Sequence, residues 1–112
     1  MSQHEISWML PWRALQFQPE IPHVQKQYEM EIAPPHPLWG KKGQVIGRRV
    51  DCDDVVVALN DGTYAIVHLV WASGPGPGAF PAQYPSAVFY KSLGEFVAAM
   101  NEDAEEYVRV ET

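Results

Sequence analysis

The sequence predicts an α+β fold: a three- to four-stranded antiparallel meander from Gln44 to Tyr90, packed by a C-terminal helix and preceded by an N-terminal helical segment. Three observations predict it: valine-rich segments in the centre of the chain, an Asp-Gly turn between two of them, and a helix-capping sequence after the last. The chain has 112 residues, the size of one domain with one hydrophobic core. We therefore expect a single domain over residues 1–112.

Branched aliphatic residues dominate three central segments, 44–50, 54–59 and 63–71, and such residues favour strands. Asn60-Asp61-Gly62 joins the last two segments, and Asp-Gly is a preferred hairpin turn because both residue types tolerate positive φ. Polar residues 49–53 connect the first two, so the three segments form a meander. A short fourth strand is expected at 87–90, after a loop at 72–86 whose glycines and prolines exclude a helix or a central strand.

The C-terminal helix is expected over 92–106. Ser92 followed by Glu95 is a capping box. Four apolar residues then follow at i, i+3, i+4 and i+7, which gives the helix one apolar face: Leu93, Phe96, Val97 and Met100. This face is expected to pack on the sheet, and the helix to end before Tyr107. If it covers the side that holds Val67, Leu69 and Trp71, His68 lies on the opposite side.

Prolines interrupt the N-terminal segment, residues 1–37. Its first 20 residues form an aromatic arm with a large apolar set: Trp8, Met9, Leu10, Trp12, Leu15 and Phe17. This arm either lies on the core of its own domain as a helical turn or makes a contact with a partner, such as a homodimer contact. A short helix is favoured from near Ile21 to Pro34, although the alternation of Tyr28, Met30 and Ile32 also fits a strand.

The charge distribution excludes several classes of protein. Of the net charge of -6, residues 92–112 carry -5, from six carboxylates and Arg109. The basic cluster at 41–49 is offset by aspartates at 51–54, so the basic surplus of a nucleic-acid-binding protein is absent. No apolar run approaches the roughly 20 residues of a membrane span. One cysteine and a non-basic N-terminus fit a cytoplasmic protein.

No cofactor is expected. Gly74 to Gly78 has the glycines of a phosphate-binding loop, but no Lys-Ser/Thr follows and its prolines remove backbone amides. Cys52 has no second cysteine with which to build a zinc finger. As a nucleophile, with His36 or His68 as base, it is disfavoured, because the flanking Asp51 and Asp53 raise the pKa of the thiol.

The candidate catalytic residues are polar groups of the central block. Strand alternation places His68 on the opposite face from Val67 and Leu69, where it can meet the aspartates of 51–54. One interpretation is a structural histidine bonded to a carboxylate. The other is a site in which His68 works with Asp53 or Asp54, either on a divalent metal or in acid–base chemistry, with Arg49 as an anion clamp and 74–78 as a lid.

Three motifs of the chain resemble those of a group of small bacterial proteins of unknown function. They begin at His36, Arg49 and Tyr64 and read HPLxGK, RxDCDDV and YAxVHLxW. The resemblance covers residues 36–71, whereas the loop at 74–78 departs from the group's usual continuation. It implies no catalytic residue. The candidate binding residues are His36, Lys41, Trp71 and Trp39, which lie in these motifs, and Trp12 of the aromatic arm.

Two hypotheses for function follow. The first is a non-enzymatic protein-binding module, an inhibitor or adaptor that uses the acidic C-terminal face and the aromatic arm; in size and charge the chain is similar to immunity proteins encoded beside bacterial toxins. The second is a small hydrolase-like enzyme built on His68 and an aspartate.

Overall fold

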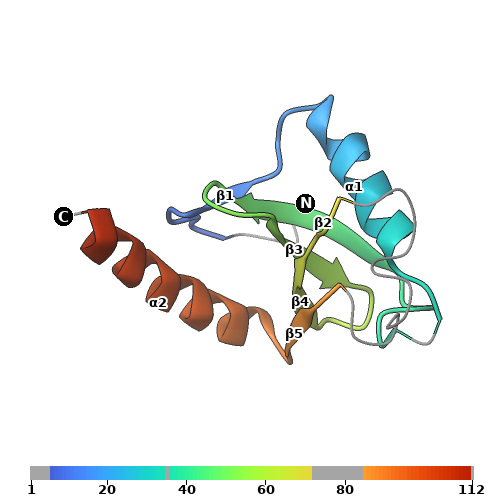
Figure 1. The fold of residues 1–112 in the computed structure, drawn as a ribbon. Coiled ribbons are helices and arrows are strands. Elements are labelled where there is room, and N and C mark those ends of the chain that lie inside the picture. Colours follow the sequence, from blue (N-terminus) through green and yellow to red (C-terminus); the bar gives the residue numbers. More distant parts are fainter. Residues whose placement is uncertain (1–5, 35, 72–84, 112) are drawn as a thin grey trace.

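The computed structural model describes residues 6–34, 36–71 and 85–111. Within these residues, five strands and two helices follow one another (Figure 1). In chain order they are β1 (Trp12–Ala14), α1 (Glu20–Glu31), β2 (Gly43–Arg49), β3 (Asp54–Leu59), β4 (Tyr64–His68), β5 (Ala87–Tyr90) and α2 (Leu93–Glu111). The α+β prediction is confirmed.

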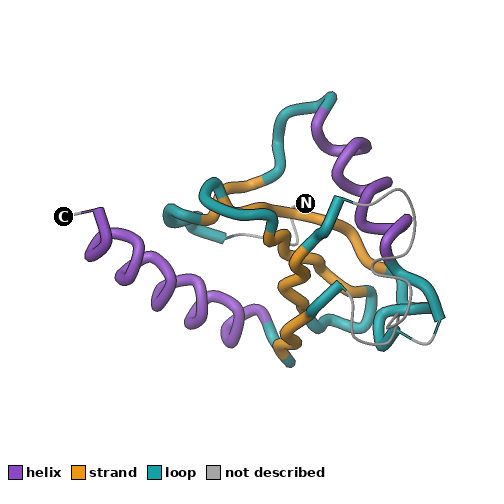
Figure 2. Tube along the Cα trace, in the orientation of Figure 1, coloured by secondary structure: helices purple, strands orange, loops and turns teal. Residues whose placement is uncertain are grey.

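The strands form one antiparallel sheet in the order β1-β2-β3-β4-β5, a simple meander (Figure 2). The turn at 60–62 joins β3 to β4, with Gly62 at a φ of 88°, as an Asp-Gly hairpin requires. The sheet has one strand more than expected. The additional strand is β1, in the arm for which a helical turn was one of two interpretations, and its three residues pair with 47–49 of β2.

The helix α1 covers one face of the sheet. Strand alternation sends Val55, Val57 and Leu59 to this face, where they form a buried cluster with Val24 and Tyr28 of α1. Burying one such aliphatic side chain stabilises the fold by roughly 1.5–3 kcal/mol. The helix expected between Ile21 and Pro34 is therefore present and packs through one face.

The helix α2 covers the opposite face, so the sheet lies between the two helices (Figure 1). Phe96 is fully buried, with the ring of Trp12 edge-on at 5.8 Å and that of Tyr64 stacked at 6.4 Å. The arrangement considered from the sequence, with α2 on the face of Val67 and Leu69, is not the one observed, because α1 occupies that face. Both faces of β4 are apolar, and alternation alone does not assign a helix to either.

The helix α2 also continues to Glu111, beyond the expected end at 106. Ala104 is buried and extends the stripe of Phe96 and Met100 by one further turn. At the other end, the amide of Glu95 donates to Ser92 Oγ at 3.2 Å, while Glu95 Oε1 accepts from the amide of Lys91 at 3.0 Å. In the part of the chain that the structure describes, no helix is long and apolar enough to cross a membrane.

Candidate functional site

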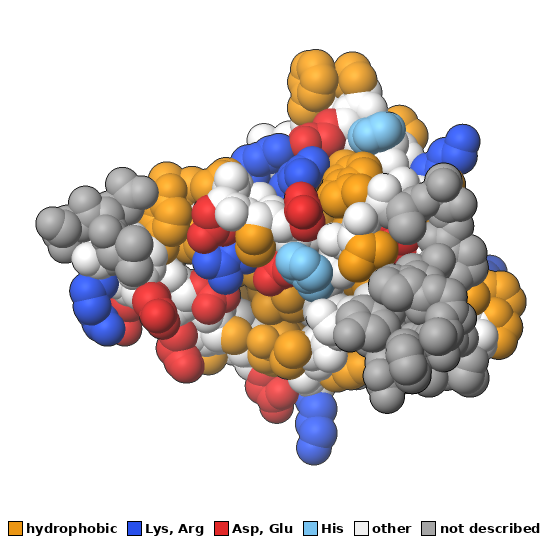
Figure 3. Space-filling view, viewed as in Figure 1, with side chains coloured by type: hydrophobic (Ala, Val, Ile, Leu, Met, Phe, Trp, Pro, Cys, Tyr) orange, Lys and Arg blue, Asp and Glu red, His pale blue; other side chains and the backbone are white. Residues whose placement is uncertain are grey.

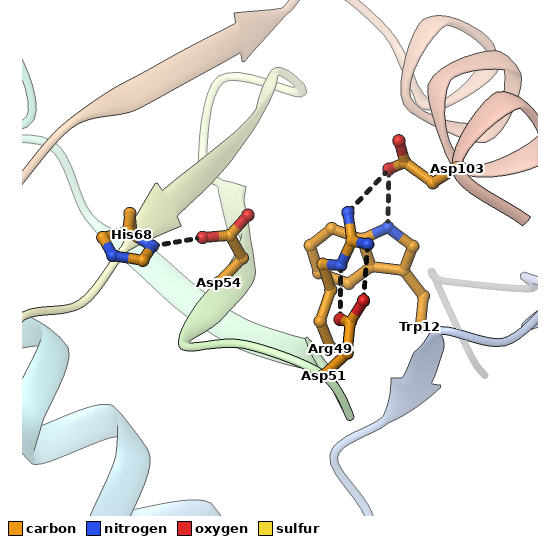
Figure 4. Close-up of polar contacts among 6 residues, drawn as sticks. All are labelled: Trp12, Arg49, Asp51, Asp54, His68 and Asp103. Carbon is orange, nitrogen blue, oxygen red and sulfur yellow. Dashed lines mark hydrogen bonds and ion pairs between the residues drawn. The ribbon is translucent and has the colours of Figure 1, made fainter. Parts of the chain in front are cut away.

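His68 and Asp54 lie directly opposite each other on β4 and β3. His68 Nδ1 is 2.6 Å from Asp54 Oδ1 (Figure 4). The His68 side chain is about half exposed, at 51%, and that of Asp54 is 23% exposed. No hydrogen bond from a described residue occupies Nε2, so a proton could be exchanged with a bound molecule at that atom.

Arg49 lies at the end of β2, next to α2, and is held on three sides (Figure 4). Its Nε and Nη2 donate to the two carboxylate oxygens of Asp51 at 2.8 and 2.9 Å. Its Nη1 lies 3.6 Å from Asp103 Oδ2, and its guanidinium lies 5.7 Å from the centroid of the Trp12 ring. Trp12 Nε1 donates to the same Asp103 oxygen at 2.9 Å, so this cluster joins β1, β2 and α2.

The ion pair between Arg49 and Asp51 shifts the pKa of both groups. The hydrogen bond from Arg49 lowers the pKa of the Asp51 carboxyl, and the same bond raises the pKa of the guanidinium. Both groups are therefore charged at neutral pH, and their charges largely cancel. Arg49 as an anion clamp stays a prediction, one that requires an incoming anion to compete with Asp51.

The other two arginines nearby share one carboxylate. Arg13 donates from Nη1 and Nη2 to Glu20 at 3.0 and 2.8 Å, and Arg48 Nη1 donates to Glu20 Oε2 at 3.1 Å. The hydrogen bond from Arg13 lowers the pKa of Glu20. Thus Glu20 of α1 neutralises part of the basic cluster, a partner that the sequence alone did not indicate.

An open groove of about 630 Å³ separates these arginines from the connection between β2 and β3. Its lining is polar and consists of Arg13, Arg48, Arg49, Val50, Asp51, Cys52 and Asp53. The pKa of the Cys52 thiol is raised, mainly by desolvation and in part by the Asp54 and Asp51 carboxylates. The sequence analysis predicted a raised pKa for this thiol, and the direction agrees. The main cause is burial, however, and not repulsion by the neighbouring carboxylates.

His36 is buried, with an exposed fraction of 3%. Its Nδ1 accepts a hydrogen bond from the amide of Leu38 at 3.0 Å, so the ring proton is on Nε2, which lies 2.8 Å from the carbonyl oxygen of Pro85. Both ring nitrogens are therefore used to tie the segment before β2 to the segment before β5.

The remaining predicted binding residues are separated from one another. Trp12 is buried in the cluster under α2, whereas Trp39 is 57% exposed. Lys41 Nζ lies 3.5 Å from Asp61 Oδ2. Trp39 and Lys41 share the rim of a small pocket of about 160 Å³ whose apolar wall includes Tyr28.

Trp71 and the buried Glu31 form a contact that the sequence analysis missed. Glu31 is the last residue of α1 and has no exposed surface. Its carboxylate accepts hydrogen bonds from the amides of Val70 and Trp71, both at 2.8 Å, and from Gln27 Nε2 at 2.6 Å. The sequence does contain a signal that Glu31 is buried. Val24, Tyr28 and Glu31 have the i, i+4, i+7 spacing of one buried helix face.

Trp71 itself has a φ of 57°, a conformation that a bulky residue rarely adopts. Its ring stacks on His23 at 5.7 Å, and the Arg48 guanidinium lies 5.9 Å from its centroid. The hydrogen bond to Glu31 and these two contacts hold the strained backbone. The lid predicted at 74–78 lies outside the described residues.

The structure thus brings together His68 and Asp54, and separately Arg49, Asp51 and Asp103. Asp53 lines the groove beside Cys52. Within residues 6–34, 36–71 and 85–111, no three His, Cys, Asp or Glu side chains gather in a way that could hold a metal ion. No protein-family model, curated protein or solved structure matches the chain.

Proposed function

We propose that the protein is a non-enzymatic protein-binding module of the bacterial cytoplasm, an inhibitor, an immunity-like protein or an adaptor. The observation that best supports this proposal is the exposed acidic side of α2. Glu95, Glu102 and Glu106 are exposed and follow one another at i, i+7 and i+11, so they share one side of the helix. In Figure 3, acidic side chains gather at the lower left, where α2 runs.

The neutralisation of the arginines strengthens this proposal. Arg13 and Arg48 are paired with Glu20, and Arg49 with Asp51 and Asp103. Residues 92–112 hold -5 of the total charge of -6, so most of the net negative charge of the molecule lies on α2 and its end. Such a surface attracts a basic partner and raises the association rate at low ionic strength.

The experiment compares two variants that carry the same net charge. Glu102→Gln/Glu106→Gln removes two charges from α2, and Glu29→Gln/Asp53→Asn removes two exposed charges elsewhere. Immobilised protein is incubated with lysate of the source cell at low and high salt. The proposal predicts a partner that the wild type and the control retain at low salt, and that the α2 variant loses. No retained protein, or equal retention by both variants, would refute it.

A second candidate function depends on the pairing of His68 with Asp54 at 2.6 Å. In this alternative, Asp54 orients the imidazole and His68 Nε2 transfers a proton to or from a substrate, as in hydrolysis. Chromogenic ester and phosphoester substrates test it. Turnover that His68→Gln and Asp54→Asn both abolish supports an enzyme, and absence of turnover in the wild type counts against one.

A further inference from the structure

A second groove, of about 710 Å³, lies between the segment that precedes β1 and the last turns of α2. Six residues line it: Met9, Leu10, Ala104, Glu105, Val108 and Arg109. In contrast to the groove beside Arg49, most of its surface is apolar. It therefore differs in chemistry from the candidate site described above.

Three large apolar side chains of this groove face water. The exposed fractions are 46% for Met9, 56% for Leu10 and 58% for Val108. The neighbouring Trp12 of the same arm is 1% exposed, so the arm buries Trp12 and leaves Met9 and Leu10 exposed. A contiguous apolar patch of this kind is typical of a protein interface.

The charged residues of the groove indicate what covers it. Glu105 and Arg109 are exposed and lie one helical turn apart on α2. If two copies of α2 pack antiparallel about a twofold axis near Tyr107, Glu105 of each copy faces Arg109 of the other. A twofold interface repeats each contact, so one such arrangement gives two complementary ion pairs.

We propose that this groove is the interface of a homodimer, in which α2 packs antiparallel against α2 of a second copy. Met9, Leu10 and Val108, the exposed apolar side chains of the groove, form its centre. The patch is small, and interfaces below about 1,200 Å² are weak or transient. The dimer therefore forms at high protein concentration and does not depend on the proposed basic partner.

Charge reversal gives a direct test by sedimentation velocity over a range of concentrations. Glu105→Arg places four positive charges at the interface, and Arg109→Glu places four negative charges there. Each single variant is expected to weaken dimerisation about tenfold or more, because two attractive pairs become repulsive. An equimolar mixture of the two single variants restores dimerisation, because every pair between unlike copies is again complementary.

The mixture separates this interface from an effect within one helix, since mixing two chains changes no contact within either α2. The double variant Glu105→Arg/Arg109→Glu also dimerises as the wild type does. Val108→Ser weakens the dimer, whereas Val88→Lys on the exposed edge strand β5 leaves it unchanged; circular dichroism verifies the fold of each variant. A wild type that stays monomeric, a mixture that fails to dimerise, or a dimer lost only in Val88→Lys would overturn the proposal.

Discussion

The carboxylate of Glu31, at the end of α1, accepts the backbone amide of Trp71, 40 residues further along the chain, at 2.8 Å. The amide of Val70 donates to the same carboxylate. Together these bonds fix the end of the β4 segment to the helix that covers it. A buried carboxylate is tolerated here because three donors satisfy it.

Removal of the Glu31 carboxylate should strongly destabilise the protein. Glu31→Ala leaves the partly buried amides of Val70 and Trp71 without their acceptor, and a buried unsatisfied group costs about 1–3 kcal/mol. We expect urea unfolding to show a loss of about 2–5 kcal/mol, and a smaller loss for Glu31→Gln, whose carbonyl oxygen can still accept one amide. Glu29→Ala, on the exposed side of the same helix, is the control and should change stability by less than about 0.5 kcal/mol.

Gly47 is required by the close approach of the N-terminal arm. A Cβ atom at this position would lie 2.6 Å from Trp8 Cζ3 and 2.9 Å from the carbonyl oxygen of Arg13. Gly47→Ala should therefore destabilise the fold by about 1–3 kcal/mol, because β1 and Trp8 must move away from β2. Gly94→Ala, where the nearest atom is 3.8 Å away, should instead stabilise α2 by up to ~1 kcal/mol. Equal melting temperatures for the two variants would contradict this account.

The contact between Asp54 and His68 shows how much of the site follows from the sequence. Counting outward from the turn at 60–62 pairs Ala58 with Tyr64 and then Asp54 with His68, because antiparallel register is fixed by the turn. The same count cannot place Asp103 or Glu20, because both reach the arginines from helices whose packing on the sheet the strand register does not fix. Local pattern determined the strand pairing, and tertiary packing determined the ion pairs.

The strand β1 and the position of α2 escaped prediction for a related physical reason. Three residues, Trp12–Ala14, carry too little pattern to indicate a strand, and their pairing depends on residues 47–49 of β2. Both faces of β4 are apolar, with Val67 on one side and Tyr64 on the other. Only the packed structure decides which helix covers which face.

The two hydrogen bonds of His36 can be separated by substitution. Asn can reproduce the acceptor at Nδ1 for the Leu38 amide, whereas Gln can reproduce the donor at Nε2 for the Pro85 carbonyl. We expect both variants to retain part of the stability that His36→Ala loses, which is about 2–4 kcal/mol because a cavity and unsatisfied backbone groups remain. Thermal unfolding measures the stability of His36→Asn, His36→Gln and His36→Ala. A His36→Ala protein as stable as the wild type would exclude a structural role for His36.

Alkaline unfolding should report on Tyr28, which lies buried between α1 and the sheet. Burial raises the pKa of its phenol to about 12, with a smaller contribution from Glu29. The unfolded chain releases this proton near pH 10, so the stability that depends on the neutral phenol is complete below about pH 10 and declines as the pH rises toward 12. Urea midpoints measured from about pH 8 to 11.5 should fall above pH 10 in the wild type and fall less in Tyr28→Phe. Tyr107→Phe, which changes a tyrosine outside the α1 cluster, is the control, and a decline as steep in Tyr28→Phe as in the wild type would assign the alkaline transition to another group.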